Sequence, residues 1–469
     1  MSHIVLRDVE VQGSRVDVHV SGAVIAAMGP TPPTPAHCQI IDGGGGALLP
    51  GLWDHHIHLF ALAAAQTSTR AGPPQVTTID QLASILCEAA DRHPSDGWVR
   101  AVGYHESVAG SLDRHTLDRI VASRPVRIQH RSGTQWILNS AAVAALDLDR
   151  AKHPGIERDR QGHPTGRLLD ADCWLRDRLG PGDPPDLSQV GRTLASFGVT
   201  GVTDATPYDG IVDLEALAGA VTTGALPQRI VVTAGPALAA ASFPAHLTSG
   251  PVKIILHEHK LPNLDELVEW IRRAHLHHRP VAVHCVTRAT LALALAAWDT
   301  TGAHPGDRIE HGSVIPLELL DPIAQHGLTV VTQPSFVTER GDQYLADVDP
   351  HDRAHLYRCR SLLDARIPLA AGTDAPFGDP DPWRAIASAT HRRTPAGATL
   401  SAHETISAAR AIELFLGPPD QPGGPPRTLK PGTPADLCLL DAPLREALNH
   451  PDSNHVAATL IHGAVAWSR

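Results

Sequence analysis

Short apolar runs of strand length recur from about residue 199 onward and alternate with helical stretches. Seven such runs follow one another along the chain: GVTGVTDA, RIVVTAG, VKIILH, VAVHC, RIEHG, LTVVTQP and IPLAAGTDA. Near-continuous apolar strands that alternate with helices are typical of a parallel sheet covered on both faces. With GLWDHHIHL at residues 51–59 the count reaches eight, so the pattern predicts an α/β fold of the (β/α)8, or TIM-barrel, type.

The clearest helical stretch covers residues 264–278. Its apolar positions recur at helical spacing and share one face: Leu264, Leu267, Val268, Ile271 and Ala274. Asn263 precedes this stretch and Glu266 follows three residues later, which is the spacing of a capping box. We therefore expect the helix to begin directly after Asn263.

Both ends of the chain have a different pattern, with short runs in which apolar and polar residues alternate as in half-buried strands. Neither end could form a stable sheet alone, so we expect residues 1–50 and 428–469 to build one small composite β-sandwich domain. The barrel then covers residues 51–427. Residues 60–198 form a long insertion between its first two strands, and this insertion is too long to be a bare loop. GWVRAVGY and PVRIQHR are strand-like runs within the insertion.

Composition narrows the possible partners and the compartment. The chain has 469 residues, 42% of them hydrophobic, and a formal net charge of −11, which argues against a nucleic-acid or anionic-membrane surface. No apolar run approaches the ~20 residues needed to span a bilayer. The start of the chain lacks the pattern of a signal peptide, and six cysteines are scattered singly, so we expect reduced thiols and a cytoplasmic location. The oligomeric state stays open, and a homodimer is compatible with the sequence.

Polar residues that can bind metals or transfer protons stand at or near the carboxyl ends of the predicted barrel strands. They are His56, His58, Lys253, His284, His311 and Asp374. Each alone has a structural explanation, such as a hydrogen-bonded core histidine, an ion-paired lysine or a capping aspartate. Barrel enzymes build their active sites at this end, and imidazole and carboxylate groups are usual ligands of zinc and similar ions. Their joint occurrence therefore favours a metal site.

The first of these strands contains three histidines in DHHIHL. Because side chains alternate along a strand, Asp54, His56 and His58 share one face, and His55 faces the surrounding layer. The pattern therefore predicts His56 and His58 as ligands.

The set of an H-x-H strand, a strand-four Lys, strand-five and strand-six His and a strand-eight Asp resembles the amidohydrolase superfamily of metal-dependent hydrolases. Longer phrases narrow this to the amidohydrolase-3 branch, which includes N-substituted formamide deformylases. These phrases are LNSAAVAALDLD, GIERDRQGHPTGRLLDAD, RIEHGSVI, GTDAPFGDPDPW and LKPGTPADLCLLD. The resemblance covers nearly the whole chain.

The resemblance implies a site for divalent metal ions, with two Zn²⁺ as the expected complement. His56, His58 and Asp374 would hold one ion, and His284 and His311 the second. Lys253 would bridge the two ions as a carbamate, because a lysine ammonium cannot ligate a cation. The alternative is a single-metal site, in which Lys253 is uncarboxylated and His311 faces the substrate.

The sequence departs from the branch at pocket positions. The Asp-Gly that usually follows the strand-four lysine is absent, and alternation along VKIILHEHK places His257 on the face of Lys253. We expect His257 to take the place of the missing aspartate. Five residues of the insertion are further candidates for substrate contacts, although ordinary packing explains each equally well: Tyr104, His105, His130, Arg131 and Trp136.

The expected function is hydrolysis of an amide-type C–N bond by a metal-activated water, with Asp374 as general base and general acid. The substrate would be a small-molecule or peptide amide, and the activity that of a hydrolase of C–N bonds other than ordinary peptide bonds. Two other activities remain open, a peptide-processing amidohydrolase of a natural-product pathway and a cyclic-amide hydrolase or deaminase. A metal-binding scaffold without turnover is disfavoured because the ligand set includes the catalytic aspartate.

Overall fold

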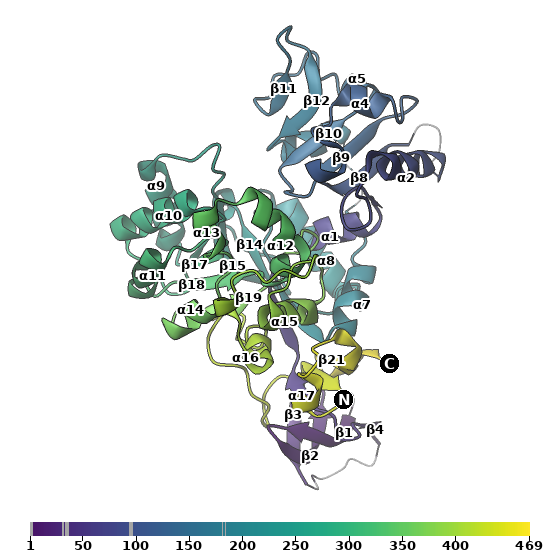
Figure 1. Ribbon diagram of the computed structural model, residues 1–469. Coiled ribbons are helices and arrows are strands. Elements are labelled where there is room, and N and C mark those ends of the chain that lie inside the picture. The colour runs from purple at the N-terminus through teal and green to yellow at the C-terminus, as the bar shows by residue number, and fades with distance from the viewer. Residues whose placement is uncertain (1–2, 31, 33–36, 93–96, 181, 183) are drawn as a thin grey trace. The chain divides into compact units, whose positions relative to one another are not determined.

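The computed structural model describes residues 3–30, 32, 37–92, 97–180, 182 and 184–469 (Figure 1). The chain divides into two compact units. One consists of residues 1–59 and 186–469, and the other of residues 60–185.

Eight parallel strands form the central sheet of the first unit, in the order β19-β18-β17-β16-β15-β14-β13-β6. All eight predicted strands are present, and the expected barrel is confirmed. Their bounds are β6 (Leu52–Ile57), β13 (Val199–Asp204), β14 (Arg229–Ala234), β15 (Leu247–Ile255), β16 (Val281–Cys285), β17 (Arg308–His311), β18 (Thr329–Thr332) and β19 (Leu369–Ala371).

The barrel closes between its first and last strands through hydrogen bonds at their carboxyl ends. The Asp374 amide donates to the His56 carbonyl at 2.7 Å, and the His58 amide donates to the Ala375 carbonyl at 2.9 Å. Gly372 allows this approach, because a Cβ there would lie 2.5 Å from the backbone nitrogen of His56. The candidate ligands His56, His58 and Asp374 therefore belong to the seam of the barrel.

Helices follow most of the strands and cover the barrel (Figure 1). They are α7 (Ser188–Ser196), α8 (Ile211–Thr222), α9 (Leu264–Leu276), α10 (Arg288–Thr301), α11 (Leu320–Gln325), α12 (Ser335–Asp347), α13 (Pro350–Arg353), α14 (Arg360–Asp364), α15 (Pro382–His391) and α16 (Ala408–Glu413). The capping box of Asn263 and Glu266 is present, as predicted. Leu264 differs from the prediction, because it is exposed in the first turn of α9, whereas the other four apolar positions are buried.

The two ends of the chain build two four-stranded sheets beside the barrel. One has the order β3-β2-β1-β4 and the other β22-β21-β20-β5. The strands are β1 (His3–Val11), β2 (Ser14–Ser21), β3 (Val24–Gly29), β4 (Gln39–Asp42), β5 (Leu48–Pro50), β20 (Leu437–Leu440), β21 (Val456–Ile461) and β22 (Ala464–Ser468), with helix α17 (Leu444–Ala447). Leu6 and Ile25 from the amino end share one apolar core with Leu437 and Leu460 from the carboxyl end. Burial between the two ends makes these short strands stable.

The second unit has a six-stranded sheet of its own, ordered β11-β12-β10-β9-β8-β7. Its strands are β7 (Thr69–Arg70), β8 (Val99–Tyr104), β9 (Val126–His130), β10 (Gln135–Leu138), β11 (Ile156–Arg158) and β12 (Pro164–Leu169). Its helices are α1 (Leu59–Gln66), which begins at the last residue of the first unit, α2 (Ile79–Arg92), α3 (Glu106–Ala109), α4 (Arg114–Asp118), α5 (Ser140–Ala145) and α6 (Asp172–Leu179). Separate apolar clusters lie in this unit, so it has its own core. No helix in the described part of the chain is both long and apolar enough to cross a membrane.

Asp381 joins α15 to the segment that precedes β21. Its side chain caps α15 by accepting from the Trp383 amide at 2.9 Å, and it also accepts from the Ser453 hydroxyl at 2.7 Å. The residue is 7% exposed, and this burial raises the pKa of Asp381 from 3.8 to about 6, against the lowering effect of both hydrogen bonds. Between pH 3.8 and about 6, Asp381 is therefore ionised in the unfolded chain but still protonated in the folded protein.

We expect wild type to lose stability relative to Asp381→Asn as the pH rises from 4 to 7. The folded protein holds this proton up to about pH 6, whereas the unfolded chain releases it near pH 3.8. The loss for wild type is at most about 3 kcal/mol and is complete above the folded pKa. Thermal unfolding midpoints of both proteins at each pH measure it. A constant difference between the two midpoints across this range would contradict the interpretation.

Candidate metal centre

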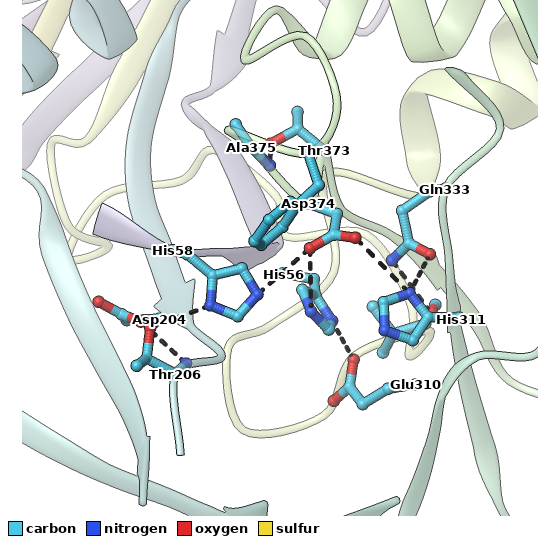
Figure 2. A network of polar contacts seen from close by, with 12 residues as sticks. His56, His58, Asp204, Thr206, Glu310, His311, Gln333, Thr373, Asp374 and Ala375 are labelled. Carbon is cyan, nitrogen blue, oxygen red and sulfur yellow. Dashed lines mark hydrogen bonds and ion pairs between the residues drawn. The ribbon is translucent and has the colours of Figure 1, made fainter. Parts of the chain in front are cut away.

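The six sequence-predicted ligands all project from the strands of the first unit. His56 lies in β6, His58 directly after β6, Lys253 in β15, His284 in β16, His311 at the end of β17 and Asp374 three residues after β19. The carboxyl ends of parallel strands in a barrel meet at one rim, so these residues gather around one site. Figure 2 shows the Asp374 carboxylate facing His56, His58 and His311.

Three atoms converge most closely at this rim. Asp374 Oδ1 lies 3.2 Å from His58 Nε2 and 3.5 Å from His56 Nε2. His56, His58 and Asp374 together form a group whose ligand atoms could hold one metal ion. Two imidazoles and one carboxylate are an ordinary protein ligand set for zinc and related divalent cations.

Glu310 determines which nitrogen of His56 carries the proton. The Nδ1 atom of His56 donates to the Glu310 carboxylate, which also accepts from Arg308 Nε at 2.5 Å. All three side chains are buried. A proton on Nδ1 leaves a lone pair on Nε2, the atom that faces Asp374. Among the residues that the structure describes, neither His56 Nε2 nor Asp374 Oδ1 has a hydrogen-bond partner, as expected for two acceptors that bind the same cation.

Thr206 orients the ring of His58. His58 Nδ1 lies 3.0 Å from Thr206 Oγ1, and the Thr206 amide donates to Asp204 at 3.0 Å (Figure 2). Asp204 also accepts from the buried Tyr208 hydroxyl at 2.9 Å. This network fixes the plane of the His58 ring and directs Nε2 toward Asp374. Polar partners of this kind orient metal-binding histidines.

The electrostatics of the site favour the unprotonated forms of its ligands. Burial and the nearby Lys253 lower the pKa of His56 to about 3, although Glu310 opposes this change. Burial alone would raise the pKa of Asp374, but the imidazoles of His58, His56 and His311 lower it well below its ordinary value. At neutral pH His56 is therefore a neutral imidazole and Asp374 an ionised carboxylate, which are the metal-binding forms.

The other three predicted ligands lie beside this group. The His311 ring centroid is 4.7 Å from that of His56 and 4.5 Å from that of His284, and His311 Nδ1 bonds Gln333 Oε1 at 2.8 Å. Lys253 is 2% exposed, and its Nζ atom has no hydrogen-bond partner among the described residues. Burial lowers the pKa of Lys253, although Glu310 opposes this effect. A buried amine without a partner is costly unless another group satisfies it.

A change of backbone conformation lets two consecutive residues of β17 serve the site. Arg308 and Glu310 are two positions apart, point to the same face of β17 and contact each other. Regular alternation would therefore point the next residue, His311, to the opposite face, away from the barrel interior. His311 instead has φ +69°, a left-handed conformation that turns its ring toward His56. Asp374 has φ +54° and is turned similarly. Left-handed non-glycine residues are strained and are common at functional sites.

The supporting residues Glu310, Thr206 and Gln333 are not among the ligands and contacts that the sequence predicts. The signal for Glu310 was present in RIEHG, because two charged residues interrupt a strand that is otherwise apolar. Thr206 and Gln333 are ordinary polar residues after strands, and only their contacts with His58 and His311 distinguish them.

His55 lies apart from the converging atoms. It is fully buried, and its ring lies near that of Trp53. In the part of the chain that the structure describes, neither of its ring nitrogens has a hydrogen-bond partner. Its Nε2 faces Gly417, in the segment that returns to the terminal sheets. His55 therefore packs on the side of β6 opposite to the ring of His56.

The candidate substrate residues of the insertion lie in the second unit, where several have structural contacts. Tyr104 donates to the Gly110 carbonyl at 2.5 Å, and Trp136 Nε1 donates to Asp172 at 2.8 Å. The Nε2 atoms of His105 and His130 lie 3.9 and 3.0 Å from Glu106 Oε2. The Arg131 amide donates to the Tyr104 carbonyl at 2.8 Å. In the first unit, His257 lies in the turn after β15, its ring 5.5 Å from that of His259.

Comparison with known proteins agrees with this geometry. The amidohydrolase family model matches residues 39–466, so the chain belongs to this family of hydrolases, and the resemblance noted in the sequence is confirmed. An N-substituted formamide deformylase of Arthrobacter pascens is 23% identical over 92% of this chain and 90% of its own length.

Two solved structures have a similar fold. A metal-dependent hydrolase of Pyrococcus horikoshii has a TM-score of 0.69 at 18% identity, covering 88% of this chain and 92% of its own. The N-isopropylammelide isopropylaminohydrolase of Burkholderia multivorans has a TM-score of 0.53 at 18% identity, covering 99% and 98%.

We expect Glu310→Gln to weaken metal binding by about 10- to 100-fold, because the amide no longer holds the His56 Nδ1 proton with a full charge. Competition with a chromogenic chelator measures the affinity. Glu404→Gln is the matched control, since Glu404 is also fully buried and paired with an arginine, Arg358, away from the six candidate ligands. Equal affinity losses in both variants would show that Glu310 acts only on stability.

Proposed function

We propose that this protein is a metal-dependent amidohydrolase that cleaves an amide-type C–N bond in a small molecule. The observation that carries the proposal is the position of Asp374 Oδ1, which lies 3.2 Å from His58 Nε2 and 3.5 Å from His56 Nε2. Within the described part of the chain, His56 Nε2 and Asp374 Oδ1 have no hydrogen-bond partner. Family membership supports this reading. The formamide deformylase among the relatives makes N-formyl amines the first substrates to test.

The proposed metal complement is two Zn²⁺ ions. His56, His58 and Asp374 would hold the first, and His284 and His311 the second, with Lys253 carboxylated and shared between them. The unpartnered Lys253 Nζ and the close rings of His284 and His311 support this arrangement. A single-ion centre held by the first three residues is the alternative.

A bound divalent cation would polarise the scissile carbonyl and make a water molecule more acidic. Asp374 is placed to handle the proton of that water. Its Oδ1 faces His56 and His58, whereas its Oδ2 lies 3.9 Å from His311 Nδ1, so the two oxygens face different parts of the site. One oxygen can ligate while the other accepts the proton from the attacking water and returns it to the leaving nitrogen.

Buried surroundings serve this proton transfer. Asp374 is 6% exposed and His311 5% exposed, so few bulk waters compete for the proton. No observation favours peptide processing or ring deamination over simple amide hydrolysis. A cytoplasmic location and a homodimer remain predictions.

We expect the metal-loaded protein to hydrolyse at least one member of a panel of N-formyl, N-acyl, cyclic-amide and short-peptide substrates. Asp374→Asn should lower kcat by about 100-fold or more, because the amide cannot accept the proton. Amine release measures turnover, and metal content is measured in the same samples. Near-normal turnover in a variant with full metal content would refute the assigned role of Asp374.

We expect His58→Ala to lose bound metal and His55→Gln to retain it, since His58 presents Nε2 to Asp374 and His55 packs on the other side of β6. Elemental analysis of the purified proteins measures the content. Two ions per chain and a labile mass increment of one CO2 on Lys253 would support the two-ion centre. One ion with an unmodified lysine would leave only the single-ion alternative, and metal loss from His55→Gln instead of His58→Ala would reverse the assignment.

A further inference from the structure

A cationic side chain stands beside the candidate metal centre without a structural anion. Arg340 lies on α12, which begins two residues after Gln333, the partner of His311. The helix therefore starts at the same rim of the barrel as the ligands. The guanidinium of Arg340 lies over the Phe336 ring, with its Cζ atom 4.1 Å from the ring centroid.

The segment that carries Asp374 holds Arg340 close to the ligands. Arg340 Nη2 donates to the Phe377 carbonyl, and the Phe377 amide donates to the Asp374 carbonyl at 2.8 Å. The Phe377 ring packs edge-on against His58, with 5.5 Å between the ring centroids. Phe377 thus contacts Arg340 on one side and both His58 and Asp374 on the other.

No carboxylate of the described residues pairs with this guanidinium. Arg340 makes no ion pair within the part of the chain that the structure describes, and its side chain makes one hydrogen bond, to Phe377. Its neighbour Glu339 accepts from the Asp379 amide at 3.0 Å. A partly buried guanidinium has five N–H donors, and leaving most of them without an anion is costly. A tether to one carbonyl would not require an arginine.

Two phenols complete the surroundings of Arg340. The hydroxyls of Tyr344 and Tyr357 lie 3.0 Å apart, and the Tyr357 ring packs against Phe336 at 5.7 Å between centroids. Desolvation lowers the pKa of Arg340, but the two tyrosines, Glu339 and Asp374 raise it overall, so the guanidinium stays charged. Asp374 is therefore close enough for its charge to act on Arg340.

We propose that Arg340 binds a carboxylate of the substrate, so that the preferred amides carry an acidic group on the amine side, as N-acyl amino acids do. This inference rests on the proposed amide hydrolysis and assigns its substrate class. A planar guanidinium held on an aromatic face matches a carboxylate with two parallel N–H donors. The aromatic wall of Phe336 and Phe377 would pack against the apolar part of the same molecule.

The test compares two substrates that differ only in the carboxylate: N-formylleucine and N-(3-methylbutyl)formamide. We expect wild type to prefer the acid in kcat/KM, and Arg340→Gln to reduce that preference by about 10- to 100-fold while hydrolysis of the neutral compound changes little. Gln retains an N–H donor for the Phe377 carbonyl. Arg340→Lys keeps the charge without the planar fork and should fall between the two.

A binding measurement separates this inference from the proposed function. Calorimetric titration of the metal-loaded protein with 4-methylpentanoate should show binding that Arg340→Gln weakens by the same factor. If Arg340→Gln loses activity equally on both substrates and still binds 4-methylpentanoate like wild type, Arg340 only positions the Asp374 segment and the proposal is wrong. A wild-type preference for the neutral compound would also overturn the proposal. If neither amide is cleaved, the proposed function is in question and the titration alone decides the role of Arg340.

Discussion

The rest of the site depends on acceptor atoms that face one another without a proton between them. His56 Nε2 and Asp374 Oδ1 would be an unfavourable pair in a buried place unless a cation lies between them. The surrounding residues maintain this arrangement. Glu310 and Thr206 bind the Nδ1 atoms of the two histidines, so each ring presents its Nε2 atom to Asp374. The nearby imidazoles keep Asp374 ionised.

The same residues also close the barrel. The hydrogen bonds between the ends of β6 and β19 are made by the backbones of His56, His58 and Asp374 and the residue after it. Asp54 reinforces the seam by accepting from the Thr373 amide at 3.0 Å. Side-chain geometry at the site is therefore set by backbone bonds that the fold needs in any case. This coupling explains how strained conformations at His311 and Asp374 are tolerated.

Sequence patterns were sufficient to predict the barrel and the candidate ligands, because both depend on patterns within single short segments of the chain. Apolar runs gave all eight strands, and position at strand ends selected His56, His58 and Asp374. Contacts between distant strands were not predictable in this way. Strand alternation predicts that either Glu310 or His311 faces inward, and only the left-handed φ of His311 allows both. Nothing in the sequence distinguishes Arg340 from the charged residues near it, and its site depends on how α12 packs against the segment of Phe377 and Asp379.

The insertion has a consequence for the order in which the protein folds. The ladder between β6 and β13 pairs Asp54 with Val202, which are 148 positions apart (202 − 54), whereas such strands are near neighbours in a simple barrel. Ordering so long a loop has an entropic cost, and that cost falls if residues 60–185 first fold as a compact unit with their own core. We expect β6, with His56 and His58, to join the barrel late. The metal centre would then be among the last parts of the molecule to form.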